Sequence, residues 1–221
     1  MGGSPVFLDP LIIPLIEGPA ILDLGCGFGK WGALCTTNYW ETVAPVPQGR
    51  PRITGCDAFQ PNVDHAMGSG FYEAVRQALF PPLPFEEASF DTVLLVEVIE
   101  HLEEAPGREL LEEAKRVARK RVVLSTPNYS ALRPGHSTMT GYNDHEAHLS
   151  YWTREMLRAM GFRLYGAGGH PGGRIWRGGL HRLGLLPWYD RVGRQLLSGP
   201  SHFFPALSDN VVGVWQRSAL R

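Results

Sequence analysis

Cysteine is scarce in this chain of 221 residues, and its spacing excludes several kinds of site. Cys26, Cys35 and Cys56 form no Cys-x-x-Cys pair, which argues against a zinc ribbon or a dithiol redox motif. An odd number of cysteines without a secretory signal fits reduced thiols, so we expect a cytoplasmic protein.

Excess charge and long apolar runs are also missing. The net charge of −1 gives no overall signal for nucleic acid or a membrane surface, so neither is expected as a partner. The apolar stretch at residues 6–16 contains Asp9, Pro10 and Pro14 and is too short to span a bilayer. What remains is a composition with 43% hydrophobic residues, enough for a sizeable globular core.

The segment AILDLGCGFGKW, residues 20–31, is the part around which the chain is organised. An apolar run that contains Asp23 precedes Gly25, Gly27 and Gly29, and residues that can form a helix follow. This order predicts a buried strand, a tight turn and a helix N-terminus, the beginning of a βαβ unit. The glycines leave room for a ligand, and the free N–H groups at the helix start favour polar or anionic ligand atoms.

The glycine spacing is not that of a dinucleotide fingerprint, because Lys30 stands where the third glycine of G-x-G-x-x-G would fall. The pattern D-x-G-x-G-x-G resembles motif I of the class I S-adenosylmethionine-dependent methyltransferases. That resemblance implies S-adenosyl-L-methionine as cofactor, with Asp23 helping to hold its amino group. The loop residues that would cradle its methionine part are Gly25, Cys26, Gly27 and Gly29. A glycine-rich turn that binds nothing is the alternative.

An acidic residue, Asp57, ends the predicted strand at residues 52–56. The resemblance implies that its carboxylate accepts hydrogen bonds from both ribose hydroxyls of the cofactor. An ordinary helix N-cap is the alternative. Ala58 and Phe59 complete this side of the predicted cofactor site, where Phe59 either covers the adenine or belongs to the core. Many relatives carry an aspartate after the third strand, but this chain does not, so backbone groups are expected to recognise the adenine.

A second group of polar residues follows the apolar strand predicted at residues 92–96. The segment EVIEHL resembles motif IV of the E-V-x-E-H-L methyltransferases. Ligands of α/β sheets bind beyond the carboxyl ends of the strands. The resemblance therefore puts Glu97, Glu100 and His101 near the transferable methyl group or the substrate, and it makes Glu97 a candidate cofactor contact as well.

Methyl transfer to an amine or a hydroxyl requires that the acceptor lose a proton. The candidate proton acceptors are His101 and His148, followed by Glu97 and Glu100, and a structural role stays open for each of them. His148 lies in the segment 129–150, which has little apolar periodicity. We interpret this segment as a lid over the substrate.

The same four residues permit a metal-dependent alternative. Together with the segments STPNY and H-x-x-x-W-T-R-E, they resemble the metal-binding set of small-RNA 2′-O-methyltransferases. A divalent ion there would lower the pKa of a ribose hydroxyl. The E-V-x-E-H pattern also occurs in methyltransferases that use no metal, so the metal site stays open. A further alternative is an inactive methyltransferase-like binding subunit, against which the intact glycine loop and Asp57 argue.

The resemblance covers residues 8–162 well and implies an α/β fold. We predict a doubly wound Rossmann-like sheet of seven strands, mostly parallel with an antiparallel last strand, in one domain over residues 1–221. The expected strands are at residues 20–24, 52–56, 72–79, 92–96, 121–124, 162–165 and 210–216. The expected helices are at residues 8–17, 29–40, 61–67, 103–119, 151–160 and 180–197. Residues 42–51 are expected to form a loop, and residues 166–208 a C-terminal cap whose first part, 166–179, is a connector.

The acceptor is predicted to be a small molecule or a saccharide-type metabolite, methylated on oxygen or nitrogen. Residues 154–194 contain eight arginines but only two acidic residues, Glu155 and Asp190. This basic region indicates either a solvated face or a cap that selects an anionic substrate.

Overall fold

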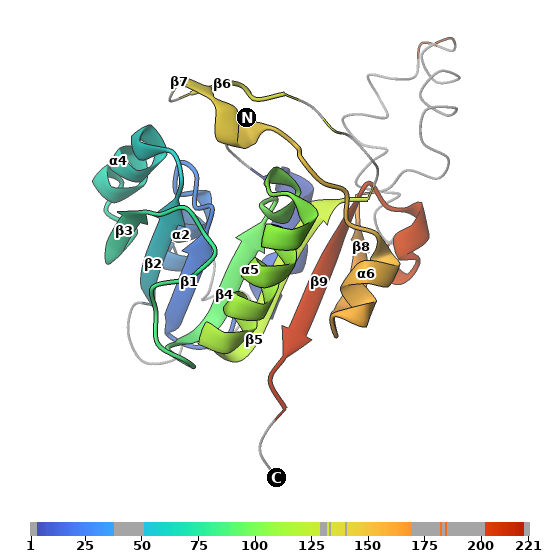
Figure 1. The fold of residues 1–221 in the computed structure, drawn as a ribbon, viewed down its shortest axis with the longest axis horizontal. Coiled ribbons are helices and arrows are strands. Elements are labelled where there is room, and N and C mark those ends of the chain that lie inside the picture. Colours follow the sequence, from blue (N-terminus) through green and yellow to red (C-terminus); the bar gives the residue numbers. More distant parts are fainter. Residues whose placement is uncertain are drawn as a thin grey trace.

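The computed structural model describes residues 4–37, 51–128, 132, 134–139, 141–168, 182, 184 and 202–218. Seven strands form one sheet in the order β3-β2-β1-β4-β5-β9-β8 (Figure 1). The strands are β1 (Ala20–Leu24), β2 (Arg52–Asp57), β3 (Ala74–Gln77), β4 (Phe90–Val96), β5 (Ala118–Pro127), β8 (Arg163–Ala167) and β9 (Asn210–Gln216). A separate hairpin consists of β6 (His136–Thr138) and β7 (Gly141–Asn143).

Helices cover both faces of the sheet, and each face has its own apolar core. The α-helices are α1 (Asp9–Ile12), α2 (Lys30–Thr36), α4 (Gln60–Gly68), α5 (Glu104–Val117) and α6 (Arg154–Ala159). The 3-10 turns are η1 (Val6–Leu8), η2 (Ile13–Leu15), η3 (Ile99–His101), η4 (Asp144–Glu146) and η6 (Pro205–Leu207). Helices α5 and α6 pack on one face, and the N-terminal turns, α2 and α4 pack on the other. Among the described residues, no helix is both long and apolar enough to cross a membrane.

The strand directions confirm the predicted fold class. Strands β3, β2, β1, β4 and β5 are parallel, and β9 runs antiparallel to both of its neighbours, β5 and β8. All seven residues of β4 are buried, as expected for a central strand with helices on both faces. The carboxyl ends of β1, β2, β4 and β5 therefore meet at one edge, where the candidate site lies.

Several boundaries differ from the prediction for physical reasons. The expected strand at residues 72–79 is shorter, because Tyr72 is buried in the core before β3 begins. The helix expected to reach residue 119 ends at Val117, because Ala118 already pairs with Phe90 in the sheet. Strand β5 is correspondingly longer than the expected 121–124 at both ends.

The helix expected at residues 151–160 begins only at Arg154. Thr153 is its N-cap, and its hydroxyl accepts a hydrogen bond from the Met156 amide (3.1 Å). The N-terminal helix expected at residues 8–17 is a series of short turns that accommodates Pro10 and Pro14.

The predicted lid contains more regular structure than its sequence indicated, since it includes the hairpin β6–β7 and η4. Other expectations lie outside the described residues. These are the loop at 42–50, the end of the helix 29–40 beyond residue 37, most of the connector 166–179, and all but two residues of the helix 180–197.

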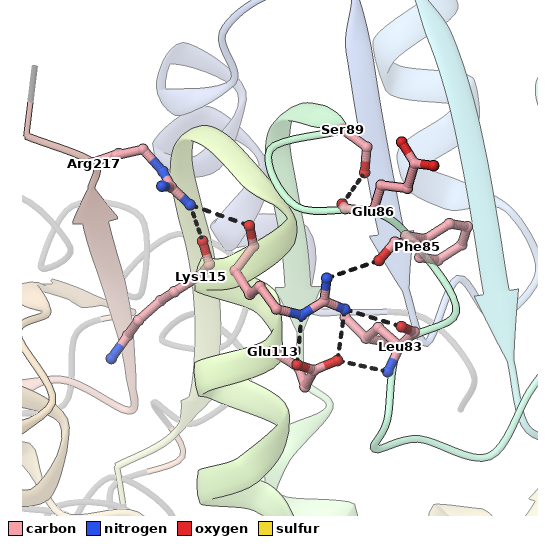
Figure 2. Close-up of polar contacts among 8 residues, drawn as sticks. Leu83, Phe85, Glu86, Ser89, Glu113, Lys115 and Arg217 are labelled. Carbon is pink, nitrogen blue, oxygen red and sulfur yellow. Dashed lines mark hydrogen bonds and ion pairs between the residues drawn. The ribbon is translucent and has the colours of Figure 1, made fainter. Parts of the chain in front are cut away.

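The end of the sheet remote from the site is held together by arginine side chains (Figure 2). The Arg116 guanidinium donates to the Leu83 and Phe85 carbonyl oxygens (3.1 and 2.9 Å) and pairs with Glu113. Arg217, after β9, donates to the backbone carbonyls of Lys115 and Arg116 (2.9 and 3.1 Å). Those carbonyls belong to the last turn of α5, which has no helical partners for them. The arginines thus attach the segment before β4 and the end of β9 to α5.

Candidate active site

The glycine loop between β1 and α2 is shaped by a close approach to its neighbours. Gly25 has a φ of +67°, and a Cβ atom there would come within 2.6 Å of Val98 Cγ2. The amides of Gly25 and Cys26 both donate to the Cys56 carbonyl oxygen, at 2.8 and 3.0 Å. Both the conformation and the space therefore require glycine at position 25, and the loop is attached to the end of β2.

Asp57, the last residue of β2, is bonded to the same loop. Its Oδ2 accepts a hydrogen bond from the Gly27 amide (2.9 Å), and its Oδ1 accepts from the Phe59 amide and the Asn62 side chain (2.9 and 3.1 Å). A carboxylate has about four acceptor positions, so this set leaves room for a hydroxyl donor.

Asp23 lies deeper than the resemblance implies. Its side chain is 1% exposed, and Oδ2 accepts a hydrogen bond from the Tyr72 hydroxyl at 2.6 Å. Burial raises the pKa of Asp23 to about 7, although the hydrogen bond from Tyr72 opposes this shift; the nearby charge of Asp57 adds to it. Asp23 does not line the cavity described below, and its contact with a cofactor amino group stays a prediction.

Glu97 directly follows β4 and has a φ of +57°, a left-handed conformation that is strained for any residue except glycine. Its Oε1 accepts a hydrogen bond from the Ser125 hydroxyl (2.6 Å), and its Oε2 accepts from the Asn210 side chain (2.9 Å). Its amide donates to the Ser125 carbonyl oxygen (3.1 Å). Contacts from β5 and β9 therefore hold this strained residue in place.

Glu100, His101 and His148 form a compact cluster. One ligand atom of each lies within 4.8 Å of those of the other two. Glu100 is 2% exposed and accepts a hydrogen bond from the Thr126 hydroxyl (3.0 Å). His101 Nδ1 lies 3.0 Å from the Ala147 carbonyl oxygen, which can only accept, so this nitrogen carries a proton; in the neutral ring Nε2 is then the acceptor. Carboxylate and imidazole ligands at this spacing suit either proton transfer or a divalent cation.

The segment that carries His148 is attached to η3 through the backbone. The amide of Leu149 donates to the Glu100 carbonyl oxygen (2.8 Å). The Trp152 indole N–H donates to the Ile99 carbonyl oxygen (3.1 Å), and its ring is fully buried. A Cβ atom at Gly107 of α5 would overlap this ring, so glycine there admits the tryptophan. The T-shaped contact of the His101 and His148 rings, with centroids 4.9 Å apart, follows from this attachment.

One cavity of about 610 Å³ joins the two groups of residues. The predicted site residues that line it are Gly25, Cys26, Gly27, Asp57, Ala58, Glu97, Glu100, His101 and His148. Asp23, Gly29 and Phe59 do not line it. Leu79 and Phe80 of the segment after β3 also line the cavity, as do His136, Ser137 and Asn143 of the β6–β7 hairpin.

Several residues that shape the site were missed by the sequence reasoning. Ser125 and Thr126 lie in the recognised STPN turn, so their position at a strand end could have indicated a role. Asn210 and Tyr72 gave no such signal, because their partners Glu97 and Asp23 are far away in the sequence.

Comparison with known proteins finds methyltransferases among the relatives of this chain. Residues 22–125 match the methyltransferase domain family. A Mycolicibacterium smegmatis protein named "Probable S-adenosylmethionine-dependent methyltransferase" is 30% identical over 150 residues, covering 66% of this chain and 53% of that protein. A ubiquinone biosynthesis O-methyltransferase of Sinorhizobium medicae is 34% identical over 98 residues, covering 42% of this chain and 35% of that enzyme. The chain thus spans about half or less of these relatives.

The fold also resembles solved structures over nearly its whole length. A SAM-dependent methyltransferase from Archaeoglobus fulgidus aligns over 95% of this chain and 91% of that chain, with a TM-score of 0.54 and 18% identity, which supports the fold alone. The domain match and the named relatives support a place for the chain in the class I S-adenosylmethionine-dependent methyltransferase family, whose cofactor is S-adenosylmethionine.

Proposed function

We propose that this protein transfers the methyl group of S-adenosylmethionine to an oxygen or nitrogen atom of a small-molecule or saccharide-type acceptor. The observation that carries the proposal is the shared cavity. The glycine loop and Asp57 line the same space as Glu97, Glu100, His101 and His148. A methyl donor and a proton acceptor can therefore meet without a large rearrangement, and alignment of the reactants supplies much of the rate.

In this proposal the cofactor lies along the ends of β1 and β2. The loop of Gly25, Cys26, Gly27 and Gly29 receives its methionine part, with Asp23 behind the loop. Asp57 accepts from a ribose hydroxyl at its remaining position, and a second ribose contact would replace one of its present bonds. Ala58, Phe59 and the backbone after β3 surround the adenine. Glu97 lies where the methyl-bearing end of the cofactor would reach the acceptor.

The acceptor's proton would pass to the histidine pair. In the tautomer that the Ala147 carbonyl oxygen selects, His101 presents an unprotonated Nε2, the form that a general base requires. His148 is the other candidate, and buried Glu100 lies beside both. The β6–β7 hairpin, which contributes lining residues, would act as the lid of the acceptor side.

A metal-dependent 2′-O-methyltransferase acting on RNA is the second candidate, and the cluster of Glu100, His101 and His148 favours it. These three groups could hold Mg²⁺ or Mn²⁺, which would lower the pKa of a ribose hydroxyl. Glu97, the fourth residue of the resemblance, bonds instead to Ser125 and Asn210 and is not part of the compact cluster. For this reason we place the metal-free reaction first.

An anionic acceptor and a cytoplasmic location are further proposals. Most of the arginine-rich region that motivates the anionic acceptor lies outside the described residues.

Labelled cofactor tests these proposals together. The protein would be incubated with methyl-labelled S-adenosylmethionine and separate pools of metabolites, oligosaccharides and RNA, each with and without EDTA. We expect label in a small molecule or saccharide, insensitive to EDTA and strongly reduced in Asp57→Ala. Label in RNA that requires metal would favour the second candidate. Cofactor binding without transfer to any pool would favour an inactive binding subunit.

A further inference from the structure

Tyr72 makes two hydrogen bonds from a single buried hydroxyl group. The side chain is 7% exposed, its O–H donates to Asp23 Oδ2 (2.6 Å), and its oxygen accepts from the Gly32 amide (3.0 Å). Asp23 is in β1 and Gly32 is in the first turn of α2, so this hydroxyl connects the two elements that flank the glycine loop.

The bond to Gly32 replaces a missing helix cap. The first amides of a helix have no helical partner, and a side chain at the N-cap position usually accepts from the third of them. The N-cap of α2 is Gly29, which has no side chain, and the third helical residue is Gly32. The Tyr72 hydroxyl accepts from this amide instead.

The ring of Tyr72 occupies space that glycines leave open. A Cβ atom would come within 3.1 Å of the ring at Gly29 and within 3.0 Å at Gly55. At Gly32 a Cβ atom would overlap it. These glycines therefore admit the tyrosine, in addition to any part they have in the loop's conformation.

We infer that Tyr72 is a positioning residue for the cofactor. Its hydroxyl caps the N-terminus of α2 and also bonds to Asp23 in β1. These two bonds hold the glycine loop in the conformation that binds the cofactor. The inference rests on the proposed cofactor site. It gives Asp23 an indirect part in binding, through Tyr72, which agrees with the placement of Asp23 away from the cavity wall.

The charge of Asp23 affects the strength of its hydrogen bond with Tyr72. The charge that acts on Asp23 is that of Asp57. Burial raises the pKa of Tyr72 and of three thiols, those of Cys26, Cys35 and Cys56, and the charge of Asp23 in turn adds to this rise, so these groups are neutral near pH 7. An ionised Asp23 is the stronger acceptor for the tyrosine hydroxyl, so this hydrogen bond should weaken as Asp23 becomes protonated.

Tyr72→Phe tests the inference because it keeps the ring and removes both hydrogen bonds. We expect the dissociation constant of S-adenosylhomocysteine, measured by calorimetry at pH 8, to rise about 5- to 20-fold. The matched control is Tyr165→Phe, since Tyr165 lies in β8 at the far edge of the sheet and should bind like the unmodified protein. Lowering the pH to 6 should weaken binding in the unmodified protein. That dependence should be smaller in Tyr72→Phe and in Asp23→Asn.

Hydrogen exchange of the unliganded proteins gives a second, independent result. The amides in the first turn of α2 should exchange faster in Tyr72→Phe but not in Tyr165→Phe. Wild-type affinity and pH dependence in a folded Tyr72→Phe, or unchanged exchange in that turn, would overturn the inference. Because the exchange measurement needs no cofactor, it still tests the cap if the unmodified protein fails to bind S-adenosylhomocysteine, a failure that would count against the proposed function instead.

Discussion

The cofactor half and the acceptor half of the cavity are held in different ways. Around the glycine loop, Asp57 and the Cys56 carbonyl oxygen bind backbone amides only a few tens of residues away. On the acceptor side, the bonds join pairs of side chains instead, such as Glu97 to Asn210 of β9 and Glu100 to Thr126 of β5. The first half depends on the backbone of one βαβ unit, whereas the second depends on the completed sheet.

Because of this difference, we expect the two halves to respond differently to substitutions. A cradle made of backbone amides needs glycine at a few positions and a few side chains, such as Asp57, that accept from those amides. A set of side-chain bonds between strands loses its geometry when any partner is removed. We therefore expect larger effects on catalysis from the acceptor half and smaller effects, confined to binding and stability, from the cofactor half.

Removal of the His148 imidazole is the strongest way to test that contrast. His148→Ala should lower kcat about 10²- to 10⁴-fold, the usual loss for a general base, while the affinity for S-adenosylhomocysteine stays nearly constant. His202→Ala is the control, because His202 stacks on Tyr165 (centroids 5.0 Å apart) and does not line the cavity. Full activity in His148→Ala would contradict both the proton-acceptor and the metal-ligand role.

The buried charge of Asp23 should appear in the pH dependence of stability. Its folded pKa is raised from 3.8 to about 7, so its favourable contribution is present below the lower value and is lost as the pH rises through about 7. The free energy of unfolding should therefore fall between pH 5 and pH 8, and Asp23→Asn should remove roughly 2–4 kcal/mol of that fall. Urea unfolding at the two pH values measures it. Asp64→Asn, at an exposed position of α4, should keep the full dependence.

Loss of the Asp57 carboxylate should weaken the cofactor half without reaching the chemistry. Asp57→Ala should reduce the binding free energy of S-adenosylhomocysteine by about 1.5–3 kcal/mol, as expected for lost hydrogen bonds to a charged group. Calorimetry with Asp64→Ala as the control measures this difference. Unchanged binding in a folded Asp57→Ala protein would refute the ribose assignment.

Metal removal should have the smallest effect. EDTA should leave methyl transfer unchanged, because the histidine pair serves as proton acceptor in the proposed reaction. If EDTA abolishes activity, Mn²⁺ restores it and Glu100→Ala matches the loss, the acceptor half is a metal site and the RNA-type reaction is favoured.

The buried parallel strands could be predicted because their signals are local, whereas the antiparallel last strand was implied by the family resemblance. A buried strand such as β4 is a continuous apolar run. The hairpin β6–β7 was not predicted because its short strands have no apolar face. Five of its six strand residues are polar or glycine.

The parts of the candidate site that lie within one sequence motif could be predicted. The contacts that form only when distant segments meet in the fold could not. The glycine loop and EVIEHL lie at strand ends, so their meeting in one cavity follows from the topology. The partners of Asp23 and Glu97 could not be predicted. Tyr72 lies in the segment before β3 and Asn210 lies in β9, far from these partners in the sequence, and the sequence around them carries no motif.

The position of β9 between β5 and β8 fixes the order in which the molecule can be assembled during synthesis. Strands β1, β2 and β3, which make up one side of the sheet, are all present once residue 77 has been made. Strand β8 is translated earlier than β9 but lies beyond it, so its partner in the sheet is missing until residues 210–216 are made. Asn210 comes with the same strand and gives Glu97 its second partner. A nascent chain shorter than this therefore carries a formed cofactor cradle beside an acceptor site that is still incomplete.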